Sequence, residues 1–307
     1  MNFRVMKTLI ERELREHRAL IWAPLITAIV IIGTAVLSST VSGGLQVSID
    51  GDSSDFMAML SADGEHQRAV FSVWMAALVL PQMLIAMIVV FFYLLDSLYT
   101  ERKDRSILFW KSMPVSDLQT VASKVLTGLV VVPLGVWALS LVTGLLVFLV
   151  ASLKLAGTPL APLAEFHVGA WFILQAVTLQ NTVVASLWYA PIAGYLLVVS
   201  VYAKRNPFLW AVLPPLLLVI FENAAFDTSR VAGFLVSRMT EFFAAVSIRN
   251  TSSDAATGDA LQSSITAAYD ALGALELLAR LDLWLGVVVA AVLVLLAARL
   301  RRWRDDA

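Results

Sequence analysis

Ionisable side chains are scarce in this chain, and their positions limit the chemistry it can perform. The three histidines, His17, His66 and His167, lie far apart and show no zinc-site spacing such as H-E-x-x-H. Glu65 and His66 are adjacent and compatible with an acid–base pair, but a solvated loop pair is the simpler interpretation. The sequence contains no G-x-x-x-x-G-K-[ST] phosphate loop and no G-x-S-x-G nucleophile motif. We therefore predict no catalytic residue, no metal site and no cofactor on this chain, which is not expected to be an enzyme itself.

Two carboxylates lie near the ends of long apolar runs. Asp96 closes one run, and Glu222 lies near the end of another. A carboxylate at the centre of a membrane helix costs about 2.5 to 3.5 kcal/mol, so such residues usually face a cavity or a partner. Asp96 has Arg102 and Lys103 nearby as partners, and Glu222 is close enough to a run end to reach the lipid headgroups. We keep both as candidate pathway residues, with Glu222 the stronger of the two.

The most charged stretch in the middle of the chain is YTERKDRSILFWKSMPVSD, residues 99–117. Charges of both signs run from Glu101 to Arg105, and an apolar group follows that water would not favour unless something covers it. Pro114 stops the helix, and Ser116 is placed to cap the next one. The pattern favours a docking element for another protein, with a short helix on the lipid surface as the alternative. The candidate docking residues are Glu101, Arg102, Arg105, Ile107, Leu108, Phe109, Trp110, Lys111 and Pro114.

The elements that must position these residues are membrane helices. The mean hydropathy is +0.81 and only 15% of the residues are charged, against about a quarter in soluble domains. The apolar residues form blocks close to the roughly 20 residues that cross a bilayer. We expect an all-α polytopic membrane protein, one domain over residues 1–307, with no nucleic-acid partner. Its six predicted spans are about 20–38, 71–95, 125–151, 182–203, 208–226 and 283–298.

Prolines and basic residues refine this picture. Five of the six spans contain proline, whose freed carbonyls need neighbouring helices or water, so we expect a packed bundle. With both termini inside, cytoplasmic segments hold 16 of the 22 Lys and Arg residues, which is the orientation that the positive-inside rule selects. No cysteine is present, so no disulfide is expected.

Two flanking segments show helical amphipathicity. Residues 1–19 carry apolar positions at helical spacing beside a charged face, which predicts an interfacial helix leading into a retained first span rather than a cleaved signal. Between the fifth and sixth spans, residues 227–282 are predicted to be exterior. Apolar residues from Val231 to Val246, and again from Ile265 to Leu278, predict amphipathic helices there. These helices would cover the outer mouth of the bundle or simply cover loop ends at the headgroups.

The 99–117 segment and its surroundings resemble the permease subunits of ABC transporters of the type-2 class. In that family the connection between spans two and three carries an acidic–basic cluster, an apolar run and a Pro-Val-Ser-like turn before a lysine. The matching residues here are Glu101-Arg102, Arg105-Ser106-Ile107-Leu108, Met113-Pro114-Val115-Ser116 and Lys124. Arg105-Ser106 departs from the Gly-Thr often found in the family. The motif covers about 30 residues, while the six-span topology with an amphipathic N-terminal helix covers the whole chain.

The resemblance implies a role and a set of partners. Residues 99–117 would be the coupling helix that docks on a separate ABC ATPase subunit, which would bind ATP and Mg. A second permease chain, identical or a sister, would complete a transporter in the bacterial inner membrane, and export is the more common direction. Membrane lipid would surround both chains. The alternative is a non-transporting sensor or scaffold that recruits a cytoplasmic partner through residues 99–117.

Overall fold

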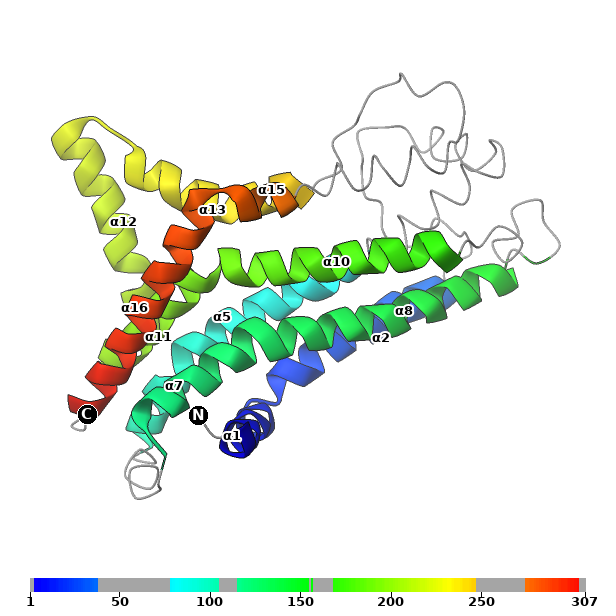
Figure 1. Ribbon diagram of the computed structural model, residues 1–307, viewed down its shortest axis with the longest axis horizontal. Coiled ribbons are helices and arrows are strands. Elements are labelled where there is room, and N and C mark those ends of the chain that lie inside the picture. Colours follow the sequence, from blue (N-terminus) through cyan, green and yellow to red (C-terminus); the bar gives the residue numbers. More distant parts are fainter. Residues whose placement is uncertain are drawn as a thin grey trace.

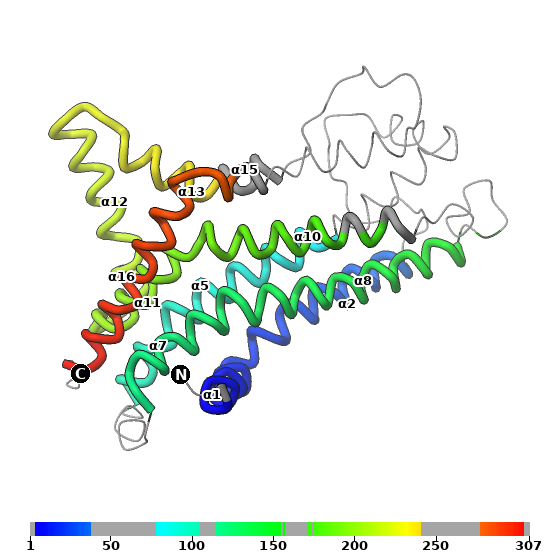
Figure 2. Tube along the Cα trace, viewed as in Figure 1, coloured from blue at the N-terminus to red at the C-terminus, as the bar shows by residue number. Residues whose placement is uncertain are grey.

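The structure is a computed structural model that describes residues 3–37, 78–104, 115–154, 156, 168–246 and 274–303. Within these ranges the chain forms helices joined by short turns and contains no strand (Figure 1). Both termini lie near the same end of the bundle, beside α1 and α7, in Figures 1 and 2. The all-α class predicted from the sequence is confirmed.

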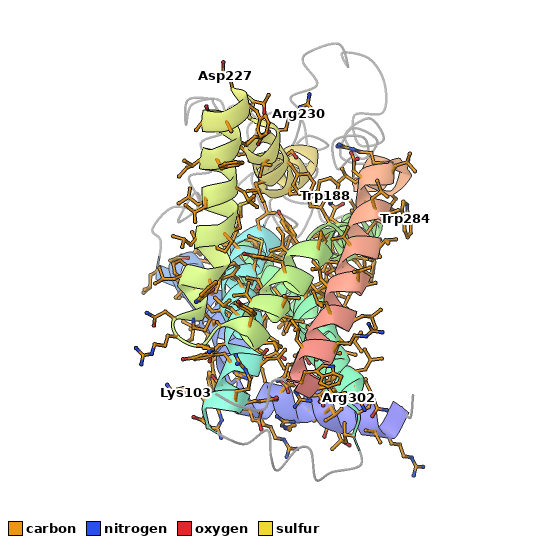
Figure 3. All side chains as sticks on the ribbon, turned by 90° about the vertical axis from the view of Figure 1, so that its left-hand side faces the viewer. Lys103, Trp188, Asp227, Arg230, Trp284 and Arg302 are labelled. Atoms are coloured by element: carbon orange, nitrogen blue, oxygen red, sulfur yellow. The ribbon has the colours of Figure 1, made fainter. Side chains whose placement is uncertain are left out.

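The first two helices meet at a bend. Helix α1, Phe3–Glu16, runs across the base of the bundle, crosswise to α12 and α16, in Figure 3. Helix α2, Ala19–Leu37, follows after a two-residue break and is apolar along its whole length. Met6 and Leu9 of α1 are buried, so its apolar stripe packs on the protein and α7 covers part of it.

The central helices contain one irregular turn, which lies next to a proline. Helix α5, Val79–Lys103, extends into the charged residues as expected. Helix α7, Asp117–Leu126, begins with a complete capping box between Ser116 and Gln119, which confirms the predicted cap. A π-helical turn, η1, Thr127–Val131, then leads into α8, Val132–Lys154. The turn precedes Pro133, which has no backbone N–H to continue the regular ladder.

Helices α10, Val168–Trp188, and α11, Ala190–Tyr202, form one broken element. They are bent by 45° at Tyr189, and Pro191 lies in the first turn of α11. The predicted fourth span began at 182, whereas the helix begins at Val168. The difference arises because Gln175, Thr178 and Asn181 lower the hydropathy of this stretch. The stretch is nevertheless helical, and these three side chains are buried.

The last helices, α12 to α16, bring the chain back to the end of the bundle where the N-terminus lies (Figure 1). Helix α12, Pro207–Phe226, stands between two residues with left-handed backbone, Asn206 and Asp227, which turn the chain sharply. Helix α13, Arg230–Val246, and the short α15, Ala274–Ala279, fall in the segment predicted to hold amphipathic helices. Helix α16, Leu281–Trp303, closes the bundle.

The apolar core lies between α5, α8, α11 and α16, with α2 and α7 beside it. Among the described residues, five helices, counting α7 to α8 as one, are long and apolar enough to cross a membrane, and the bent pair α10–α11 gives a sixth if it counts as one span. Large apolar side chains remain exposed along α2, α12 and α16, as expected for surfaces that meet lipid. The protein is therefore a multi-pass helical membrane protein.

Candidate functional site

A group of buried charges lies where α1, α5, α7 and α16 meet. Its centre is Glu101 in the last turn of α5, whose side chain is only 7% exposed. Glu101 Oε1 accepts from Lys124 Nζ at 3.0 Å and from Arg12 Nη2 at 3.2 Å, and Oε2 accepts from Arg301 Nη2 at 2.9 Å. One carboxylate thus holds cations from three other helices. We call Arg12, Glu13, Glu101, Asp117, Lys124 and Arg301 the Glu101 cluster.

Glu13 is the second buried carboxylate of the cluster. Lys124 Nζ donates to both Glu13 oxygens, at 2.9 and 3.0 Å, and the Tyr93 hydroxyl donates to Oε2 at 2.9 Å. Glu13 is 0% exposed and Lys124 is 1% exposed. The pair exists because Glu13 follows Met6 and Leu9 at helical spacing, so it lies on the face of α1 that is turned into the protein.

The cluster closes at both sides of the connection between α5 and α7. Arg301 Nη1 donates to Asp117 Oδ1 at 2.8 Å while its other nitrogen holds Glu101, so one guanidinium ties the residues before and after that connection. Arg12 Nε donates to Glu16 at 2.8 Å. Burial alone would lower the pKa of Arg12, but Glu16, Glu13 and Glu101 outweigh it and raise the pKa, so the guanidinium stays charged.

Arg102 fastens a further helix to the same end of the bundle. It is buried and donates from Nη2 to the carbonyl oxygens of Ser200 and Ala203, both at 2.8 Å. In return the Ser200 hydroxyl accepts from the backbone N–H of Leu98 and Tyr99, both at 3.0 Å. These carbonyls lie at the C-terminus of α11, where a cation is favoured by the helix dipole.

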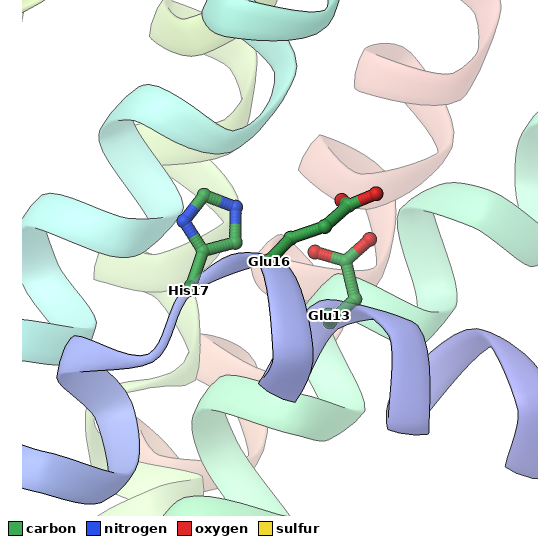
Figure 4. Close-up of side chains that lie close together, drawn as sticks. All are labelled: Glu13, Glu16 and His17. Carbon is green, nitrogen blue, oxygen red and sulfur yellow. The ribbon is translucent and has the colours of Figure 1, made fainter.

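One group of side chains near the cluster has the elements of a metal site. Single ligand atoms of Glu13, Glu16 and His17 lie within 4.8 Å of one another (Figure 4). Lys124 and Tyr93 already hold both Glu13 oxygens, however, and Arg12 holds Glu16. A metal ion would have to displace these cations, so the arrangement is that of an ion-pair network.

His17 lies at the edge of the cluster, with its ring edge-on to Tyr93 at 4.8 Å between centroids. Burial lowers the pKa of His17, the attraction of Glu13 opposes this, and the nearby Lys124 lowers it further. The imidazole is therefore neutral at neutral pH and contributes packing rather than charge.

The residues predicted for docking divide into two sets. Glu101 and Arg102 are buried and bonded within the chain, so they support the connection from inside the bundle. Arg105, Ile107, Leu108, Phe109, Trp110, Lys111 and Pro114 lie outside the described residues. The sequence interpretation did not single out Glu13 or Arg301 as site residues, although a glutamate on the apolar face of α1 was a readable signal.

The two candidate pathway residues lie apart from the cluster's core. Asp96 is exposed on α5, close enough to His17 to act on it electrostatically. Glu222 accepts hydrogen bonds from the Thr228 hydroxyl at 2.8 Å and from the backbone N–H groups of Arg230 and Val231 at 2.9 and 2.7 Å. Its carboxylate therefore caps the first turn of α13 and fixes that helix to α12.

The fold and the cluster together define the class of the protein as a multi-pass helical membrane protein whose helix ends are cross-linked by buried ions. No family model, curated protein or solved structure matches the chain. Each carboxylate of the cluster is paired with a cation.

Proposed function

We propose that this chain is the membrane-spanning permease subunit of an ATP-driven ABC transporter, most simply an exporter. A separate ATPase subunit, carrying ATP and Mg, docks on residues 99–117, and a second permease chain completes the complex. The assembly lies in the bacterial inner membrane with both termini of this chain in the cytoplasm.

The observation that carries this proposal is the position of the Glu101 cluster around the α5–α7 connection. Glu101 lies four residues before Arg105, and Asp117 lies three residues after Pro114, so the cluster holds the expected docking segment, 99–117, near both of its ends. A push on that segment would reach α1, α5, α7 and α16 together, because Glu101 and Arg301 join them directly. A coupling element needs this kind of rigid base.

The bond pattern also agrees with the residues that carry the family resemblance. Lys124, the lysine at the end of the motif, is the cation that bridges Glu13 to Glu101. Ser116, in the Pro-Val-Ser-like turn, is the cap of α7. Two of the quoted motif residues therefore have definite structural tasks that keep the segment's exit helix in place.

The first test is purification of the chain from its native membrane in mild detergent. The proposal predicts a stoichiometric soluble subunit of ATPase size, lost in Trp110→Ala, which removes the large aromatic anchor expected to dominate the interface. Trp303→Ala is the matched control, because Trp303 is an exposed aromatic at the end of α16 outside the connection. A chain that purifies alone under every nucleotide condition would contradict the proposal. The alternative function, a non-transporting sensor or scaffold, would then be favoured.

A further inference from the structure

An arginine of α13 lies against the break between α10 and α11. Arg238 is 5% exposed, and its guanidinium carbon lies 4.2 Å from the centroid of the Trp188 ring. The Trp188 indole N–H donates back to the Arg238 carbonyl at 2.9 Å. In Figure 3 Trp188 lies toward the end marked by Asp227 and Arg230, away from Lys103 and Arg302. This is the end of the bundle opposite the Glu101 cluster.

The same guanidinium bridges three helices. It donates to the carbonyl of Trp188, the last residue of α10, at 3.5 Å, and to the carbonyl of Asp282 in the first turn of α16. Pro191 has no N–H to offer the Leu187 carbonyl four residues earlier, so the helical ladder is interrupted directly beside Trp188. The neighbouring Tyr189 hydroxyl donates to the Met239 carbonyl at 3.4 Å. We call Trp188, Arg238, Asp282 and Gly286 the Arg238 clamp.

Gly286 makes room for the clamp on α16. A Cβ at this position would lie 2.9 Å from Arg238 Nη2 and 3.3 Å from both Cζ and Nη1. Any side chain there would push the guanidinium off its partners. Gly233 of α13 is different, because a Cβ there would meet nothing within 4 Å. The two glycines therefore form a natural test and control.

Helices α11 and α16 pack closely enough to move as one body. A Cβ at Gly194 of α11 would lie 3.0 Å from the Leu293 Cβ and 3.2 Å from the Ala290 carbonyl oxygen of α16. Such contacts at small residues let two membrane helices approach backbone to backbone. The break beside this pair is at Tyr189, where the axis of α11 is bent by 45° from that of α10.

Helix α13 is itself held at its start. The Glu222 carboxylate of α12 binds the hydroxyl of Thr228 and the first N–H groups of α13, as described above. Helix α13 is therefore fixed to α12 at its N-terminal end, and its residues Arg238 and Met239 contact Trp188 and Tyr189 at the break between α10 and α11. Helix α13 thus connects α12 to the broken element α10–α11.

We propose that the α10–α11 break is a hinge and that the Arg238 clamp sets its angle. Helix α16 joins the hinge to the Glu101 cluster, because Asp282 and Gly286 lie in its first turns and Arg301 in its last. Its 23 residues make a rod of roughly 35 Å. A displacement at the Glu101 cluster reaches the clamp along this rod. That use of the hinge in coupling rests on the proposed function, whereas the hinge itself does not.

The test is a distance measurement between α10 and α16 in the purified chain. The sequence has no cysteine, so Val183→Cys and Val292→Cys, both at exposed positions, accept spin labels without background. The parent should give one narrow distance distribution in nanodiscs. Arg238→Ala should raise the ratio of a second population to the first by at least about tenfold, because hydrogen bonds from a charged group to the break are lost. Gly286→Ala should act in the same direction while keeping every charge.

Matched variants decide the outcome. Arg230→Ala removes an exposed arginine from the same helix, and Gly233→Ala adds a methyl group in open space, so both should keep the parent distribution. If Arg238→Ala does not yield a folded, monodisperse protein, Arg238→Lys replaces it, since lysine keeps the charge but lacks the planar fork. A parent-like distribution in the Arg238 variant or in Gly286→Ala would overturn the proposal, as would an equal change in Arg230→Ala. The measurement needs no ATPase, so its failure and that of the proposed function are distinguishable.

Discussion

The two ends of the bundle are held together by different physics. At one end, the Glu101 cluster pairs three carboxylates with three cations, and removal of Lys124 would take a shared partner from the buried carboxylates Glu13 and Glu101. At the other end, the Arg238 clamp sets a guanidinium against carbonyl oxygens and an aromatic ring. Buried ion pairs fix position strongly and tolerate little change, whereas contacts to carbonyls can be exchanged for water or other carbonyls. The comparison indicates a rigid base at the α1 end and a movable joint at the α13 end.

The largest effect is expected from breaking the rigid base. Lys124→Ala leaves Glu13 and Glu101 without their shared cation, and should lower the free energy of unfolding by about 3–5 kcal/mol. Lys7→Ala, whose side chain is 67% exposed in a weak pair with Glu11, should change it by less than about 0.5 kcal/mol. Denaturant unfolding in detergent micelles measures both. Equal losses of unfolding free energy in the two variants would show that the buried Glu101 cluster stabilises the fold no more than an exposed ion pair does.

A smaller loss is expected at the clamp. Arg238→Ala removes the hydrogen bonds to the carbonyls of Trp188 and Asp282, so it should cost about 1.5–3 kcal/mol in the same unfolding experiment. The exposed Arg230→Ala serves as its control. A loss at Arg238 greater than that at Lys124 would reverse the comparison between the two ends.

The body that links the two ends can be tested separately. Gly194→Ala places a methyl group 3.2 Å from the Ala290 carbonyl, and should cost about 1–3 kcal/mol by forcing α11 from α16. Gly135→Ala on α8 meets nothing within 4 Å and should leave stability unchanged or slightly higher, since alanine is the better helix former. Thermal unfolding followed by circular dichroism distinguishes the signs. A gain of stability in Gly194→Ala would mean that α11 and α16 are not tightly joined.

The smallest effect concerns pH. Because burial lowers the pKa of His17 in the folded protein, the unfolded chain binds more protons as the pH falls below about 6.5. The contribution of His17 to stability is therefore present above that pH and is lost as the pH falls toward its folded pKa. His17→Gln should flatten the pH dependence of unfolding between pH 7 and 5, while Arg238→Ala should leave its shape unchanged. An unaltered profile in His17→Gln would place the titration elsewhere.

Local patterns in the sequence were sufficient to predict most of the helices. The apolar runs, the Ser116 cap and the amphipathic spacing of α1 and α13 all depend on neighbours within a few turns, and the structure confirms helices at each place. The start of the fourth span was misplaced because buried amides and hydroxyls on α10 lowered its hydropathy.

The Glu101 cluster depended on contacts that no local pattern contains. Glu13 and Lys124 are 111 positions apart, and Glu101 and Arg301 are 200 apart. A charged residue beside an apolar run is normally assigned to water, so the burial of these side chains follows only once α1, α7 and α16 are placed together. The same holds for Arg238 of α13, whose partners Trp188 and Asp282 come from two other helices, α10 and α16.

We propose that the Glu101 cluster passes movement from the 99–117 segment to the rest of the bundle. If the proposed ATPase subunit co-purifies, the most direct test uses the Val183–Val292 spin-label pair in that complex, with and without ATP. We predict that ATP shifts the distance in the parent, and that Glu101→Gln still binds the ATPase but loses the shift, with the exposed Glu11→Gln behaving as the parent. An undiminished ATP-dependent shift in Glu101→Gln would contradict the account.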